Sequence, residues 1–128
     1  MQLSTIQIAQ HRLLKDTGIE FIDTSVKTGN NSIFAPTWAM VTGYKNGTIS
    51  KAEYTDQYRA RMVSSWQTNR TLWKEVIAKE KVAIGCYCAP GEFCHRLLLK
   101  DILEEICRHG SKAFVYKGEI TKNNPPLI

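Results

Sequence analysis

Three cysteines, a histidine and an arginine lie close together in the second half of the chain, as Cys86, Cys88, Cys94, His95 and Arg96. A short apolar run that is typical of a strand ends at Cys86. If strand geometry continues through Cys88, side-chain alternation puts the thiols of Cys86 and Cys88 on one face. Cys94 then enters from the first turn of the helix that follows. Side chains of these types can bind a metal ion or carry out nucleophilic and proton-transfer chemistry.

One interpretation of the cluster is a zinc site formed by Cys86, Cys88, Cys94 and His95. Three thiolates and one imidazole complete the tetrahedral ligand set that zinc takes in structural sites. The spacing is unusual, because such sites commonly use a C-x2-C pair and this chain has C-x-C. Neighbouring residues such as Cys94 and His95 also point about 100° apart on a helix. On this interpretation the chain is a zinc-stabilised interaction module; beyond zinc, the residues leave the cofactor unknown.

The alternative interpretation is a reactive thiol, with Cys94 as the nucleophile and His95 as the proton carrier. The first turn of a helix carries unpaired amides and partial positive charge, which favour an anion and make a nearby thiol more acidic. Arg96 adds a planar donor that suits phosphate or carboxylate, whereas Glu92 in the same turn opposes the field. The fourth cysteine, Cys107, is isolated in the middle of a helical pattern, so we expect it in the core.

A second polar cluster, residues 23–29, follows another predicted strand. Ligand crevices in open parallel sheets lie beyond the carboxyl ends of the strands, so we expect Asp23 and Lys27 to face Arg96 across such a crevice. The alternative for Asp23 and Lys27 is a surface ion pair. Together the two clusters predict a site for a small anionic ligand, such as a nucleotide or a phosphorylated metabolite. The candidate ligand-binding residues are Asp23, Lys27, Cys88 and Arg96, with Tyr58 added because a buried phenol needs a polar contact for its hydroxyl.

The first third of the chain predicts a helix and a strand. Ser4 or Thr5 can cap a helix whose apolar residues recur at helical spacing, as Ile6, Ala9, Leu13 and Leu14. Residues 19–25 then favour a strand, and a polar run over residues 23–31 follows it.

The middle of the chain favours helices. Pro36 suits the first turn of a short helix that ends near residues 46–47. Ser50 and Glu53 have the spacing of a capping box and begin a long helical region, with a break near Thr68 and Asn69. The core positions expected in that region are Tyr54, Tyr58, Met62, Leu72, Trp73 and Val76.

The last third of the chain has the pattern of a strand, a crossover helix and a strand. Residues 82–86 form an apolar run typical of a strand that is covered on both faces. Residues 92–109 carry a helical apolar stripe, and Gly110 suits the end of that helix. Residues 113–116 favour another strand, and a connection of this length implies parallel pairing. The residues therefore predict a small α/β sandwich.

Length and composition are those of one ordinary globular domain. Of the 128 residues, 43% are hydrophobic and 23% are charged, and we expect one domain over residues 1–120 and a flexible tail over residues 121–128. The net charge of +5 is spread without a basic block, so a small anionic ligand is the expected partner. Nucleic-acid binding has only this charge and scattered aromatic residues in its favour.

The sequence contains neither an apolar run of membrane-helix length nor the features of a signal peptide at its start. We therefore expect a cytoplasmic protein with reduced cysteines and no membrane partner. The oligomeric state stays open.

Four segments of the chain, in order, resemble one known family. Cys94-His95-Arg96, followed by three leucines after an apolar strand, is similar to the hallmark of the "domain of unknown function 488" (DUF488) family. Residues 23–29, 34–38 and 86–88 resemble the branch of that family found in bacteriophages and some bacteria. The similarity spans about residues 4–119.

The resemblance implies a Rossmann-like α/β fold, a three-layer sandwich with a mostly parallel sheet. It marks Asp23, Lys27, Cys94, His95 and Arg96 as signature polar residues, and its phage branch implies the cytoplasm of a bacterial host. It implies no activity, so whether the chain is an enzyme stays open. The wider family commonly has an acidic residue soon after the strand cysteine, and this chain lacks one at Cys88-Ala89-Pro90.

Overall fold

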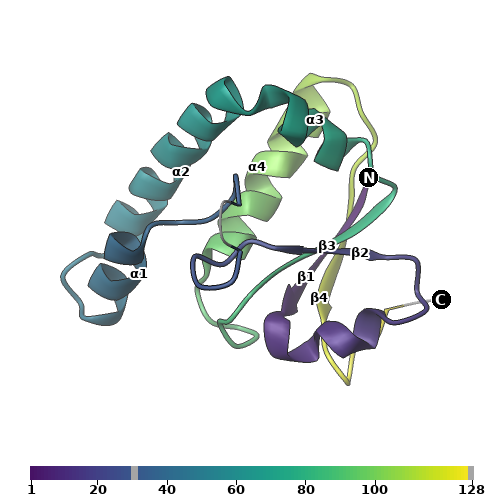
Figure 1. Ribbon diagram of the computed structural model, residues 1–128, viewed down its shortest axis with the longest axis horizontal. Helices are drawn as coiled ribbons and strands as arrows, with labels where there is room; N and C mark the ends of the chain where they lie inside the picture. Colours follow the sequence, from purple (N-terminus) through teal and green to yellow (C-terminus); the bar gives the residue numbers. More distant parts are fainter. Residues whose placement is uncertain (30–31, 127–128) are drawn as a thin grey trace.

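A four-stranded parallel sheet forms the centre of the molecule (Figure 1). The structure is a computed structural model that describes residues 1–29 and 32–126. The strands are β1 (Gln2–Gln7), β2 (Glu20–Asp23), β3 (Lys81–Cys86) and β4 (Val115–Ile120). Their order in the sheet is β2-β3-β1-β4, and every neighbouring pair is parallel. The expected α/β fold with a parallel sheet is confirmed, and all four carboxyl ends lie at one edge.

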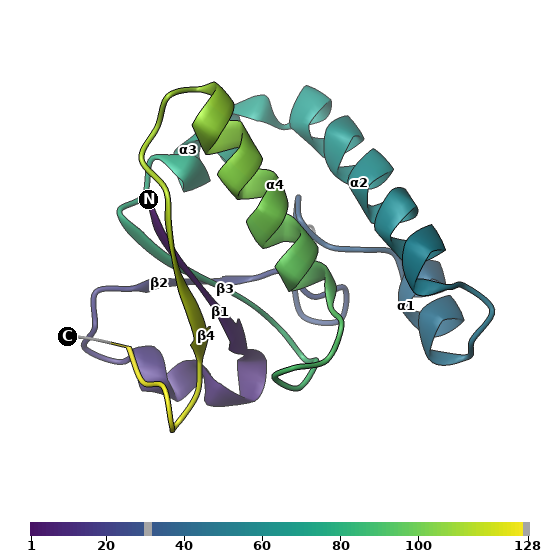
Figure 2. The ribbon, with the colours of Figure 1, turned by 180° about the vertical axis from the view of Figure 1, so that it is seen from behind.

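The two faces of the sheet are covered unequally (Figures 1 and 2). The helices are α1 (Trp38–Lys45), α2 (Lys51–Thr68), α3 (Arg70–Ile77) and α4 (His95–His109). The main core packs residues of α2, α3 and α4 against Leu3, Val82 and Ile84 of the sheet. On the other face a 3-10 helix, η1 (Ile8–Leu14), contributes Leu14 to a small cluster with Ile6, Ala83 and Ile120. The third layer of the sandwich is therefore one short helix.

The helix expected from Ser4 or Thr5 is wrong, because residues 2–7 form β1 between β3 and β4. Within the segment that was expected to be one helix, residues 8–14 alone are helical, and they form the 3-10 helix η1. Ser4 and Thr5 are buried in the sheet rather than capping a helix, and the hydroxyl of Thr5 lies 2.6 Å from that of Tyr116. The spacing of Leu3 and Ile6 suits a helix face, but in a strand the same spacing places one residue on each face of the sheet.

The long helical region begins and breaks where the sequence predicts. Ser50 Oγ accepts a hydrogen bond from the Glu53 amide, and Glu53 Oε1 accepts one from the Ser50 amide. This capping box starts α2, and Asn69 separates α2 from α3. The prediction that Leu72 lies in the core is wrong, because this side chain is 47% exposed. Its neighbour Trp73 is fully buried, as expected.

Other boundaries differ by a few residues. Thr37 caps α1, so Pro36 precedes the helix instead of lying in its first turn. Cys94 occupies the N-cap of α4, and Glu92 therefore lies outside the helix, where its carboxylate accepts from the amide of Ala89. β2 is shorter than residues 19–25, and β4 runs beyond residues 113–116.

Parts of two expected segments, residues 30–31 of the polar run and residues 127–128 of the tail, lie outside the described residues. The division into a domain over residues 1–120 and a flexible tail stays a prediction. Within the described residues, no helix combines the length and apolar character that a bilayer crossing requires.

Gly85, one residue before Cys86, is packed too closely for a side chain. A Cβ atom at this position would lie 2.6 Å from Phe21 Cε1 and 3.0 Å from the carbonyl oxygen of Ile6. We expect Gly85→Ala to lower the free energy of unfolding by about 1–3 kcal/mol, measured by urea denaturation. Gly110→Ala is the control, because its φ is −88° and its nearest contact is 3.4 Å, and we expect a change within about 0.5 kcal/mol. Equal losses in the two variants would show that the close packing around Gly85 does not stabilise the fold.

Candidate functional site

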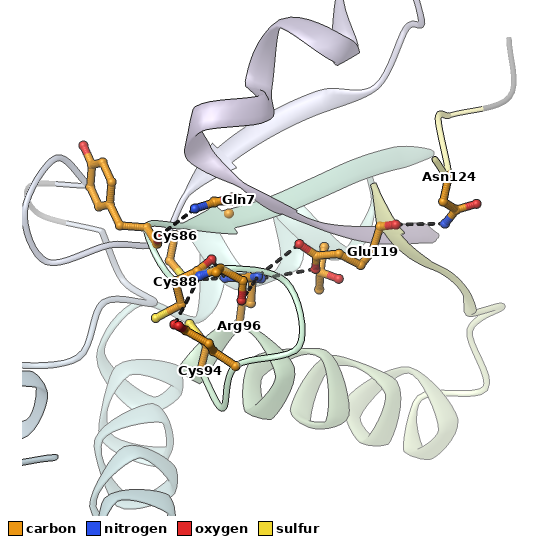
Figure 3. Close-up of polar contacts among 12 residues, drawn as sticks. Gln7, Cys86, Cys88, Cys94, Arg96, Glu119 and Asn124 are labelled. Atoms are coloured by element: carbon orange, nitrogen blue, oxygen red, sulfur yellow. Dashed lines mark hydrogen bonds and ion pairs between the residues drawn. The ribbon is translucent and has the colours of Figure 1, made fainter. Parts of the chain in front are cut away.

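Three cysteine sulfurs converge where β3 ends and α4 begins (Figure 3). The Sγ atoms of Cys86, Cys88 and Cys94 all lie within 4.8 Å of one another. Cys86 is the last residue of β3, and its side chain is on the same face as Val82 and Ile84, toward the helices. Cys86 and Cys94 are buried, whereas Cys88 is half-buried and lies on the connecting loop. The sequence predicts these three residues as a group, and the structure brings their sulfurs together.

The guanidinium of Arg96 joins the cysteine cluster to the rest of the fold. Nη1 donates to Cys86 Sγ at 2.8 Å and to the carbonyl oxygen of Cys88 at 2.9 Å. Nε and Nη2 donate to the two carboxylate oxygens of Glu119 at 3.3 and 3.0 Å, and Nη2 also contacts the carbonyl of Ala89 at 3.5 Å. Arg96 is 1% exposed. All five N–H groups are used within the protein, so the expected role of Arg96 in binding an external anion gains no support.

Glu119 and Gln7 complete the site, although no sequence pattern singles them out. Glu119 comes from β4 and forms an ion pair with Arg96 at 3.0 Å. Asn124 donates to the Glu119 carbonyl at 2.8 Å, and Gln7 donates to the carbonyl of Tyr87 at 3.3 Å (Figure 3). The sequence predicts a strand over residues 113–116, which ends before Glu119, whereas β4 runs to Ile120 and pairs Glu119 with Thr5 of β1.

His95 faces β2 rather than the centre of the three sulfurs. Its Nε2 lies 2.8 Å from the carbonyl oxygen of Thr24 and 3.0 Å from Thr24 Oγ1, which itself donates to the carbonyl of Gly85. A carbonyl only accepts, so these contacts assign the hydrogen to Nε2. The unprotonated Nδ1 is then an acceptor that faces Cys94, whose Sγ lies 3.6 Å away. This arrangement pairs Cys94 with a base that a third group orients.

Tyr58 packs against the ring of His95 in the core and does not line a crevice edge. The two ring centroids are 5.6 Å apart, and the Tyr58 hydroxyl donates to the carbonyl of Phe34 at 2.8 Å. Tyr58 is fully buried. Burial therefore explains its place in the core, and its hydroxyl is satisfied by backbone.

Asp23 is the last residue of β2, and Lys27 lies on the loop that follows it. The Thr24 amide donates to the carbonyl of Gly85, so the ends of β2 and β3 meet as expected. Asp23 Oδ1 accepts from the amide and hydroxyl of Ser25 at 2.9 and 2.7 Å. Lys27 is exposed, with Nζ 5.4 Å from the ring centroid of Tyr87. The two loops are adjacent, but the Asp23 carboxylate is largely used by its own loop.

The three thiols differ in acidity. Hydrogen bonds from the Cys88 and Cys94 thiols, helped by the charge of Arg96, hold the pKa of Cys86 well below its usual range. The same hydrogen bonds, with burial, raise the pKa of Cys94. The geometry thus favours a single thiolate on Cys86 when the thiols are free, and it lies against Arg96.

A model of the DUF488-N3a family, described as the active DUF488-N3 subclade, matches residues 23–107, which is more than half of the 128 residues. The chain belongs to this family. No curated protein and no solved structure matches the chain. The DUF488-N3a match includes all three clustered cysteines, His95 and Arg96, whereas Glu119 and Gln7 lie outside it. The expected DUF488 membership is confirmed, and the phage branch stays a prediction.

We expect Glu119→Gln to lower the free energy of unfolding by about 1–3 kcal/mol, because it leaves the buried Arg96 guanidinium without its carboxylate. This loss of stability is smaller than that expected for breaking a fully buried ion pair, because the Glu119 side chain is 21% exposed. Glu105→Gln is the control, because its ion pair with Arg59 is 3.9 Å long and both side chains are about half exposed. We expect the free energy of unfolding of Glu105→Gln to differ from that of the wild type by less than about 0.5 kcal/mol. Urea denaturation of both variants checks the difference, and comparable losses would contradict the role of Glu119.

We expect the stability of the protein to fall as the pH drops below neutral. Burial lowers the pKa of His95 below 6.5, so the unfolded chain binds a proton more readily than the folded one. The stabilisation is complete above about pH 6.5 and is lost progressively as the pH falls toward the lower, folded pKa. His95→Gln retains a donor near the Thr24 carbonyl without a titrating ring. Its unfolding free energy, measured between pH 5 and pH 8 in roughly unit steps, should depend less steeply on pH than that of the wild type. The same slope in both proteins would count against a buried neutral imidazole.

Proposed function

We propose that Cys86, Cys88 and Cys94 bind a zinc ion through three thiolates, and that the fourth position takes a small anionic ligand. The observation that carries this proposal is the distance between the sulfurs, all within 4.8 Å. Zinc–thiolate bonds are about 2.3 Å long, so the sulfurs of a tetrahedral site lie roughly 3.8 Å apart. All three sulfurs therefore lie within about 1 Å of the separation that a zinc site needs, and Cys88 is the half-buried member of the group.

The absence of a fourth protein ligand favours an open site. Among residues 1–29 and 32–126, the cluster of metal-ligating side chains consists of the three cysteines alone. His95, the expected fourth ligand, uses Nε2 on Thr24 and points Nδ1 at the Cys94 sulfur. Structural zinc sites are closed by four protein ligands, whereas sites that act on a ligand keep one position free. These contacts therefore favour a ligand-binding centre over a zinc-stabilised interaction module.

The charge around the sulfurs also supports metal binding. Three thiolates exceed the charge of one zinc ion by one negative unit, and Arg96 Nη1 lies 2.8 Å from Cys86 Sγ. A hydrogen bond from a cation to a ligating sulfur orients the ligand and offsets the surplus charge. Arg96 is in turn held by Glu119. The guanidinium thus has a function at the site even though it offers nothing to an external anion.

A bound zinc ion attracts and polarises an anionic ligand as a Lewis acid. The exposed side of the cluster is that of Cys88, where the neighbouring Tyr87 is 45% exposed and lies under the ammonium of Lys27. Lys27 is the cation best placed to meet a phosphate there. We propose a nucleotide or phosphorylated metabolite as the ligand class.

A second candidate function is nucleophilic catalysis by Cys94. The Nδ1 atom of His95 lies 3.6 Å from Cys94 Sγ, with Nε2 fixed on a backbone carbonyl, which is the arrangement of an oriented cysteine–histidine pair. Cys94 cannot be a zinc ligand and a free nucleophile at once. Its 3% exposure supports the ligand role, because a nucleophile must be reached by its substrate.

Metal analysis of protein purified without added zinc decides between these functions. We expect about one zinc per chain in the wild type, and a chelator should lower its melting temperature. Cys88→Ala should lose the zinc, whereas the matched variant Cys107→Ala should keep it, because Cys107 is buried in the core away from the cluster.

The proposal would be overturned by wild-type protein that holds no zinc, takes up none when it is added, and melts at the same temperature with and without chelator. Rapid alkylation of Cys94 at neutral pH in that metal-free protein, slowed in His95→Gln, would then establish the second candidate.

A further inference from the structure

The helices α2, α3 and α4 lie side by side on one face of the sheet (Figure 2). A groove of about 920 Å³ is lined by residues of α2, α3 and the C-terminal half of α4, whereas Cys94 lies at the N-terminal end of α4. Its floor includes the buried Met62 and Trp73, and its walls include Val63 and Trp66 on α2 and Ile106 on α4. Val63 is 58% exposed. The centre of the groove is therefore apolar and open to solvent, which is unusual for an isolated helical surface.

The rim of this groove is positively charged. Four of its side chains are cationic, Arg59, Arg70, Lys74 and Lys112, and a single one, Glu105, is acidic. Glu105 is already 3.9 Å from Arg59. The rim therefore has a net surplus of cations around an apolar centre.

We propose that this groove binds an amphipathic helix with acidic flanks from another protein. An apolar centre with a charged rim matches the helix-in-groove mode, in which side chains one turn apart fill the centre. The carboxylates of such a helix would face Arg70, Lys74 and Lys112. Charge complementarity of this kind sets the partner and the association rate.

Other occupants fit the groove less well. An extended strand needs unpaired backbone groups, and the walls are helices whose backbone is already hydrogen-bonded. A second copy of this chain carries a net charge of +5 and would bring cations to a cationic rim. A nucleic acid would satisfy the rim, but the partly exposed ring of Trp66 already has the Arg70 guanidinium 5.4 Å from its centroid. The other exposed ring in the groove is the imidazole of His109, at its edge, so a row of stacking rings is not formed.

The probe for the test is a synthetic helical peptide of about 18 residues, with leucines at helical spacing on one face and glutamates beside them. Titration into isotope-labelled protein, followed by NMR, should shift the signals of Val63, Trp66 and Ile106. Binding should weaken at least about tenfold in ~0.5 M NaCl, where surface charges are screened. A second peptide with lysine in place of each glutamate should not bind.

Variants of exposed residues locate the binding surface. Val63→Ser should weaken the glutamate peptide by about tenfold, and Lys74→Glu should weaken it while admitting the lysine peptide. Arg108→Glu is the matched control, because Arg108 is exposed on α4 outside the groove, and it should bind the glutamate peptide like the wild type.

Three results would overturn the proposal. The first is equal binding, or no binding, of the two peptides. The second is tighter binding of a single-stranded oligonucleotide than of the glutamate peptide at the same residues. The third is concentration-dependent dimerisation that Val63→Ser abolishes. The zinc site can fail without affecting these outcomes, because the residues that line the groove do not include Cys86, Cys88 or Cys94.

Discussion

The buried guanidinium of Arg96 is the contact on which the site depends. A buried cation is unfavourable unless each of its donors finds an acceptor, and Arg96 finds them on three separate segments. It reaches the end of β3 through Cys86, the connecting loop through Cys88 and Ala89, and β4 through Glu119. Meeting this requirement fixes the loop against the sheet. The loop in turn carries Cys88 to the other two sulfurs, so the same contacts that satisfy the cation also set the spacing of the thiols.

The parallel sheet brings the remaining parts of the site to one edge. β2 and β3 end side by side, so Thr24 reaches His95, and α4 starts close enough for Cys94 to face Cys86. The matched family region ends at residue 107, yet β1 and β4 supply Gln7 and Glu119. The terminal strands therefore do more than extend the sheet, because they hold the loop and the arginine of the central motif.

The sequence predicted correctly those helices and strands whose start or character depends on residues close together in the chain. The capping box at Ser50 and the apolar run of β3 depend on neighbours in sequence, and both were predicted correctly. β1 was misread because buried Ser4 and Thr5 look like helix caps until a strand lies on each side of them. The cysteine group was predictable from its spacing. The partner of Arg96 was not, since Glu119 reaches it only through the register of β4, which shifts between Leu3 and Ser4.

The central claim is that three thiolates hold one metal ion with a position left free. X-ray absorption at the zinc edge, on protein loaded with one equivalent of zinc, measures the ligands directly. We expect three sulfur neighbours at about 2.3 Å and one lighter nitrogen or oxygen neighbour. A shell of nitrogen and oxygen alone would contradict the claim, because the zinc would then lie away from Cys86, Cys88 and Cys94.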